Sequence, residues 1–145
     1  MLDLATYQQP DRIRAALGNK RIAVVGLSNN PARPSHDVTR YMLDQNDGYT
    51  VIPVNPRETE ILGATCYPDL LAAREEAGAI DMVNVFRESS AVPAIAAEAI
   101  AVGATVLWLQ LGVIHEEGIR LAESAGLNVV VDRCLKIEHA RYRHR

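Results

Sequence analysis

The stretch IAVVGLSNNPARPS, residues 22–35, joins four apolar residues to a glycine and then to a polar loop with one arginine. A strand that is apolar on both faces is typical of a parallel sheet covered on both sides. A glycine at the end of such a strand is typical of the turn that leads into a phosphate-binding loop. This stretch therefore predicts a buried parallel strand with a ligand site directly after it.

The same apolar pattern recurs along the chain, with helical segments between the runs. We expect strands at residues 21–26, 49–54, 80–86, 104–110 and 127–132, and a shorter one at 63–67. We expect helices at about 11–17, 35–45, 89–102 and 115–125. This alternation predicts an α/β fold, a three-layer, Rossmann-like, doubly wound parallel sheet of five or six strands.

Length and composition narrow the class of protein. We expect one domain over residues 1–145, with a helical extension at 1–18 and a basic tail at 140–145. The formal net charge of −3 argues against binding to nucleic acid, so any phosphate site has to be a local cluster of arginines. The longest apolar stretch, ATVLWLQLGVI, is too short to span a membrane. Two cysteines without metal-ligand spacing favour a reduced, cytoplasmic protein with no metal site.

The loop after the first strand departs from the dinucleotide fingerprint G-x-G-x-x-G. It keeps the first glycine, Gly26, but has Ser28 and Pro31 at the places of the second and third. The second strand ends in VNPR, residues 54–57, where NAD binding usually needs a carboxylate for the ribose hydroxyls. Both observations disfavour NAD.

Three arginines follow strands that end at the same edge of the expected sheet. Arg33 lies in the first loop, Arg57 at the VNPR corner, and Arg87 after NVF. A helix starting near Ser35 adds free backbone amides and a positive dipole end. Together they predict a site for a polyphosphorylated nucleotide, the alternative being that the arginines are ordinary surface cations.

Six motifs in order resemble a known family: VVGLSNNPARPSHDVTRYM, YTVIPVNPR, ILG, DMVNVFR, LWLQLGV and DRCLKIEH. They are similar to those of the small stand-alone CoA-binding proteins, which are single Rossmann-like domains like the CoA-binding domain of the succinyl-CoA synthetase alpha subunit. The resemblance covers about residues 20–139. It implies that this chain binds CoA or an acyl-CoA.

The resemblance also assigns contacts to CoA. The S-x-x-P-x-R-P-S loop at 28–35 embraces the diphosphate, the corner at 54–57 lies beside the adenosine 3′-phosphate, V-F-R borders the adenine or pyrophosphate, and W-L-Q-x-G lies near the pantetheine. With the turn glycine, the assigned residues are Gly26, Ser28, Arg33, Pro34, Ser35, Val54, Asn55, Pro56, Arg57, Phe86, Arg87, Gln110 and Gly112.

We expect binding without catalysis, because no catalytic acid, base or nucleophile can be named among the residues of the expected CoA site. One alternative is an NADP-dependent reductase that uses the same arginines, and another is a regulatory CoA-binding module for a partner subunit. A homo-oligomer is compatible with the sequence.

Single histidines and cysteines receive their own expectations. His36 is expected to be a solvated residue at a helix start rather than a phosphate ligand, and His139 and His144 to lie in the tail. Cys134 is expected to be a half-buried structural thiol, the alternative being a thiol that forms a mixed disulfide with CoA.

Overall fold

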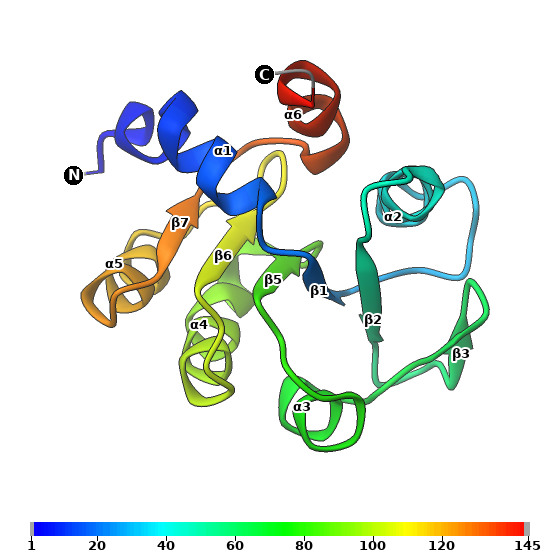
Figure 1. Ribbon diagram of the computed structural model, residues 1–145. Coiled ribbons are helices and arrows are strands. Elements are labelled where there is room, and N and C mark those ends of the chain that lie inside the picture. The colour runs from blue at the N-terminus through cyan, green and yellow to red at the C-terminus, as the bar shows by residue number, and fades with distance from the viewer. Residues whose placement is uncertain (1, 144–145) are drawn as a thin grey trace.

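Five parallel strands form the central sheet of the computed structural model, which describes residues 2–143 (Figure 1). Their bounds are β1 Arg21–Val25, β2 Thr50–Val54, β5 Met82–Val85, β6 Val106–Leu109 and β7 Asn128–Val130. The strand order is β2-β1-β5-β6-β7, and every neighbouring pair is parallel. The predicted doubly wound α/β fold is confirmed, with five strands in the sheet.

The sixth strand expected at residues 63–67 does not join this sheet. Instead, β3 (Glu60–Ile61) and β4 (Ala64–Thr65) pair antiparallel as a separate hairpin. Leu62 and Gly63 both have positive φ, 52° and 77°, as a tight two-residue hairpin turn requires. The main sheet receives from this region only a single bridge between Val54 and Tyr67.

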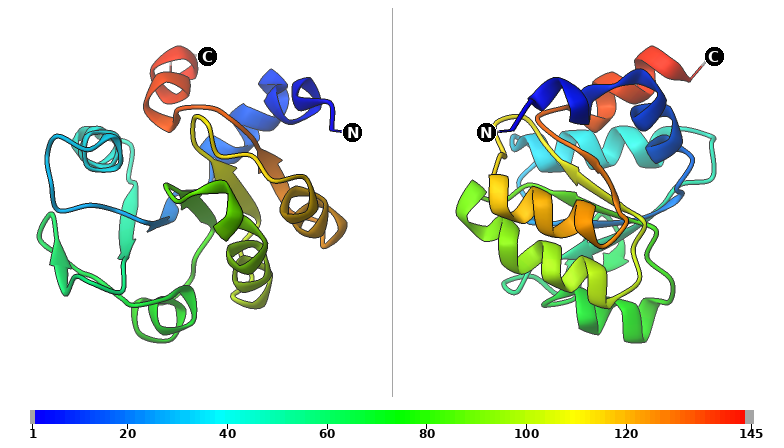
Figure 2. Two further views of the ribbon diagram at one scale, coloured as in Figure 1. Left: turned by 180° about the vertical axis from the view of Figure 1, so that it is seen from behind. Right: turned by 90° about the vertical axis from the view of Figure 1, so that its left-hand side faces the viewer.

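Helices cover both faces of the sheet (Figures 1 and 2). Helices α3 (Leu70–Ala77), α4 (Val92–Ala101) and α5 (Glu116–Ser124) lie on one side, and α1 (Pro10–Leu17), α2 (Pro34–Asp44) and α6 (Leu135–Tyr142) on the other. Short 3₁₀ turns, η1 (Leu4–Gln8) and η2 (Ser89–Ala91), precede α1 and α4.

Successive side chains of β1 point to opposite faces of the sheet, and helices cover both faces, so the strand is apolar throughout. Ala23 and Val25 pack in the core cluster under α3, α4 and α5, whereas Ile22 and Val24 pack in the cluster under α1, α2 and α6. Trp108 of β6 is fully buried in the second cluster, and its Nε1 donates to a backbone carbonyl at 2.9 Å. Each strand therefore contributes to two cores.

Two helices of the structure, α3 and α6, were not expected. Helix α6 takes in residues 140–142 of the expected basic tail, and it buries His139, which was also expected in the tail, to 3% exposure. That expectation was wrong for these residues because one face of the segment packs against the sheet cluster; His144 lies outside the described residues. For α3, the signal was the capping side chain of Asp69, which accepts from the Ala72 amide at 2.8 Å.

The strand order places a topological switch between β1 and β5. From β1 the chain moves to one side to form β2, and then returns to form β5 on the other side of β1. Crossovers that diverge in this way leave a crevice at the carboxyl ends of the two strands, where ligands of open parallel sheets bind.

Candidate ligand-binding site

Two adjoining cavities open at the switch point. The first, of about 540 Å³ and here called the Arg57 cavity, lies toward β2; the second, of about 510 Å³ and here called the Arg33 cavity, lies toward the start of α2. Both are lined by Gly26, Phe86 and Arg87, the residues that follow β1 and β5. One continuous site therefore spans the carboxyl ends of the two central strands.

The structure brings nearly all the residues assigned by resemblance to these cavities. The Arg57 cavity is lined by Val54, Asn55, Pro56 and Arg57. The Arg33 cavity is lined by Ser28, Arg33, Pro34, Ser35 and Gln110.

Gly112 lies outside both linings. Its amide donates to Oδ1 of Asp132 at 2.7 Å, and its φ is +78°. Gly112 therefore stabilises the loop after β6 and does not line the cavity wall.

Gly26 lets the two central strands approach each other. Its φ is +86°, its amide donates to the Val54 carbonyl at 2.9 Å, and the Phe86 carbonyl fills the space that a Cβ would need. A side chain at this position would both clash and force a left-handed backbone, so glycine is required here.

The two serines of the first loop fold the loop itself. The Ser28 amide donates to Oγ of Ser35 at 3.0 Å, and the Asn30 amide donates to Oγ of Ser28 at 3.0 Å. Pro34 occupies the first turn of α2, where its missing N–H costs nothing. Arg33 is the N-cap residue and its side chain is exposed, so the guanidinium and the helix start face the same cavity.

Asn55 holds the VNPR corner against the first loop. Its Nδ2 donates to the Leu27 carbonyl at 2.9 Å, and its Oδ1 accepts from the Arg57 amide at 2.9 Å. The exposed Arg57 side chain therefore projects from a braced turn, and among residues 2–143 its guanidinium has no hydrogen-bond or ion-pair partner.

Arg87 is engaged by a carboxylate. It binds Glu88 through Nη2 at 2.8 Å and Nε at 3.2 Å. The hydrogen bond from Arg87 lowers the pKa of Glu88, and the same bond raises the pKa of Arg87. A phosphate that bound to Arg87 would have to compete with this carboxylate.

Sequence reasoning missed the acidic wall of the Arg57 cavity, which Asp69, Glu88 and Glu98 form. Burial, and to a smaller degree the charge of Asp69, raises the pKa of Glu98, although a backbone hydrogen bond at Leu70 acts in the opposite direction. The described lining of the Arg33 cavity contains no carboxylate. From the sequence, only the proximity of Glu88 to Arg87 could be predicted, because the two residues are adjacent in the chain. Asp69 and Glu98 come from α3 and α4.

The two cysteines differ in access to the site. Cys134, at the start of α6, is half-buried and lines the Arg33 cavity. Cys66 is buried, its Sγ donates to the Asn55 carbonyl at 3.5 Å, and burial raises the pKa of its thiol.

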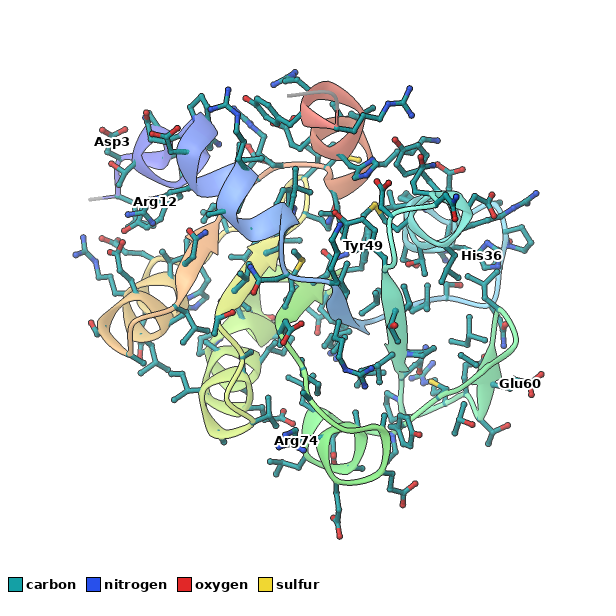
Figure 3. All side chains as sticks on the ribbon, viewed as in Figure 1. Asp3, Arg12, His36, Tyr49, Glu60 and Arg74 are labelled. Carbon is teal, nitrogen blue, oxygen red and sulfur yellow. The ribbon has the colours of Figure 1, made fainter. Side chains whose placement is uncertain are left out.

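No histidine of residues 2–143 lines either of these two cavities. His36 is only 8% exposed at the start of α2, so the expectation of a solvated residue was wrong (Figure 3). His36 is one of five buried residues of α2, two of which, Val38 and Met42, pack in the cluster on the sheet. His115 caps α5, accepting from the Gly118 amide at 3.2 Å. Within residues 2–143 no three His, Cys, Asp or Glu side chains are grouped to hold a metal, and no helix is long and apolar enough to cross a membrane.

The family profile described as "CoA binding domain" matches residues 20–140. The chain belongs to the CoA-binding domain family. The uncharacterized protein YneT of Bacillus subtilis is 44% identical over 122 residues, which are 84% of this chain and 87% of that protein. Acetate–CoA ligase [ADP-forming] II of Archaeoglobus fulgidus is 31% identical over 119 residues, 81% of this chain but only 17% of the ligase.

Solved structures of this domain have the same fold. A hypothetical protein from Pyrococcus horikoshii OT3 superposes with a TM-score of 0.86 at 34% identity, over 97% of this chain and 96% of that one. A protein from Thermus thermophilus gives a TM-score of 0.82 at 39% identity, over 92% and 98%. A dinucleotide-forming acetyl-coenzyme A synthetase of Korarchaeum cryptofilum, 24% identical over 76% of this chain and 25% of its own, has a TM-score of 0.65 and shares the fold alone.

Proposed function

We propose that this chain binds CoA or an acyl-CoA across the β1–β5 switch point and does so without catalysing a reaction. The observation that carries the proposal is the pair of cavities joined at Gly26, Phe86 and Arg87, with one exposed arginine on each. CoA has phosphate at two separated places, the diphosphate and the ribose 3′-phosphate. Membership of the CoA-binding domain family supports the same ligand.

Arg57 binds the 3′-phosphate in this proposal. Its guanidinium is exposed and unpaired among residues 2–143, and it borders a cavity of about 540 Å³. The carboxylates on the opposite wall, Asp69 and Glu98, suit the amino group of adenine and the ribose hydroxyl better than a second phosphate.

The diphosphate lies over Gly26 and the start of α2. At a helix N-terminus the free amides and the dipole favour an anion. Arg33 adds a full positive charge there, and no carboxylate lines this cavity among the described residues.

The pantetheine arm then follows the Arg33 cavity toward its apolar end. Val38, Leu111 and Val113 line that end, next to Cys134. This geometry supports a non-catalytic role, because the carboxylates of the site lie on the adenosine side and no histidine lines the described part of the Arg33 cavity. We also propose a reduced, cytoplasmic setting, which suits two free cysteines.

A matched ligand series tests the proposal by calorimetry. Arg57→Ala should weaken CoA binding by about tenfold or more, while affinity for 3′-dephospho-CoA stays as in the wild type. Arg33→Ala should weaken binding of both ligands. Arg40→Ala removes an exposed charge of the same helix, about two turns from Arg33 and outside the described lining of the cavity, and should change neither affinity.

The same series separates the alternatives. Binding of NADP with no binding of CoA would replace the proposal by a reductase. Copurification of a stable partner subunit that needs the CoA site would favour the regulatory module, and equal loss of both ligands in Arg57→Ala would mean that the 3′-phosphate lies elsewhere.

A further inference from the structure

A third cavity lies at the opposite edge of the sheet. It has a volume of about 340 Å³, and its walls come from the end of α1, the residues before β1 and β2, and the last turn of α6. Arg14, Lys20 and Arg143 line it, together with the rings of Tyr49 and Tyr142. We call it the Lys20 cavity.

Two cations of the Lys20 cavity, Lys20 and Arg14, lie against aromatic rings rather than against buried carboxylates. Lys20 Nζ lies 4.1 Å from the centre of the Tyr49 ring, and Arg14 Cζ lies 5.0 Å from the centre of the Tyr142 ring. An aromatic face orients a cation without neutralising it. Lys20 has no ion pair with any carboxylate of residues 2–143, and the only ion pair of Arg14 is with Asp11, whose side chain is 99% exposed and hence screened by solvent.

The helix end nearby does not need these cations as caps. The hydroxyl of Tyr49 donates to the Leu17 carbonyl at 2.6 Å, and Nδ2 of Asn19 donates to the Ala15 carbonyl at 3.0 Å. The Gly18 amide donates to the Ala15 carbonyl at 3.2 Å, and the Asn19 amide donates to the Ala16 carbonyl at 3.0 Å. The carbonyls of Ala15, Ala16 and Leu17 are therefore satisfied without the side chains of Arg14 and Lys20, which leaves both side chains available to a ligand.

The one acidic residue in the described lining, Asp47, is occupied. Its Oδ2 lies 2.6 Å from Nε2 of His139, and Nδ1 of that ring lies 3.0 Å from the Tyr41 hydroxyl. With Nε2–H donating to Asp47, Nδ1 accepts from Tyr41. This network anchors α6 and holds the carboxylate at the histidine, so within residues 2–143 Asp47 forms no ion pair with Arg14 or Lys20. Its single negative charge is outnumbered by the two cations.

We propose that the Lys20 cavity binds a small phosphate-bearing anion, at a site separate from the CoA site. A guanidinium and an ammonium from different segments offer several donors to one dianion, a geometry that phosphate oxygens satisfy. The proposal does not rest on CoA binding, because the two sites lie at opposite ends of the strands. The ligand class is orthophosphate, pyrophosphate or a small phosphoester.

Amide NMR of the ¹⁵N-labelled full chain tests the proposal. Inorganic phosphate and pyrophosphate are titrated separately at constant ionic strength, with glucose 6-phosphate as the phosphoester. We expect saturable shifts at Gly18, Lys20 and Tyr49. Arg14→Gln with Lys20→Gln should weaken binding by about tenfold or more, and Lys20→Gln alone serves if the double variant does not fold. Arg74→Gln, on α3 across the sheet from Tyr49, is the control and should bind as the wild type does (Figure 3).

A second arm separates this site from the CoA site. In Arg33→Ala with Arg57→Ala, the shifts at Gly18 and Lys20 should persist. Shifts confined to residues 26–35 that vanish in this variant would overturn the proposal, as would shifts at the Lys20 cavity that do not saturate with any of the three probes.

Discussion

The Phe86 carbonyl occupies the position that a Cβ on Gly26 would take, so the ends of β1 and β5 can meet only if residue 26 has no side chain. We expect Gly26→Ala to lower the free energy of unfolding by about 3 kcal/mol or more and to abolish CoA binding, because clash adds to left-handed strain. Gly63→Ala is the control: its φ is +77° but nothing lies within 4 Å, so about 1–2 kcal/mol is expected. Equal losses in urea unfolding would contradict the steric argument.

Glu88 competes with ligand phosphate for Arg87, which it binds at 2.8 Å. We therefore expect Glu88→Gln to bind CoA more tightly, by up to about fivefold, the range of an exposed ion pair. Glu75→Gln, an exposed acid on α3, changes the net charge equally and should leave the affinity unchanged. Calorimetry at one salt concentration decides, and weaker binding in Glu88→Gln would show that the carboxylate contacts the ligand.

The two thiols should react at different rates. Burial raises the pKa of Cys66, so at pH 8 iodoacetamide should label the half-buried Cys134 first. Bound CoA should protect Cys134, whereas adenosine 3′,5′-bisphosphate, which lacks pantetheine, should not. Peptide mass spectrometry measures both rates. Protection by the bisphosphate, or none by CoA, would mean that the pantetheine does not follow the Arg33 cavity.

Stability should fall in strong base because of Tyr49. Burial, with smaller contributions from Asp47 and Tyr41, raises the pKa of Tyr49 to about 12. Between pH 10 and 12 the unfolded chain loses this proton before the folded chain does, so the unfolded state binds fewer protons and stability decreases as pH rises, by up to about 3 kcal/mol.

Tyr49→Phe removes this contribution to the pH dependence. At pH 8 the variant should be less stable by about 1 kcal/mol, because it loses the hydrogen bond to the Leu17 carbonyl. Between pH 8 and 11, urea unfolding should show a smaller loss of stability for the variant than for the wild type. Parallel curves of stability against pH would show that Tyr49 does not cause the loss.

The five sheet strands could be predicted because burial on both faces leaves a continuous apolar run, as in IAVV of β1. The short strand expected at 63–67 is present as β4 but lies outside the main sheet. Strand propensity does not say which partner a segment finds, and the turn at Leu62 and Gly63 returns the chain on itself. Helix α6 was missed because its sequence is basic and mixed, and only packing reveals that Glu138 and His139 face inward.

At the candidate site, Gly26 and the three arginines were predicted from their places after strands, since parallel strands end at one edge. The acids Asp69 and Glu98 were not predicted, because their positions depend on how α3 and α4 pack. Glu88 follows Arg87 directly in the chain, but the sequence does not show that the two side chains form an ion pair.

The sequence by itself determined the α/β class, the turn glycine Gly26 and the arginines at the carboxyl edge of the sheet. The spacing of apolar residues and the backbone conformation are local properties of the chain. Only the tertiary structure decided which charges are already paired, which histidines are buried and where Arg14, Lys20 and Tyr49 meet. Such outcomes depend on contacts between segments far apart in the chain, and their energies are set by burial and by competing partners that no single segment encodes.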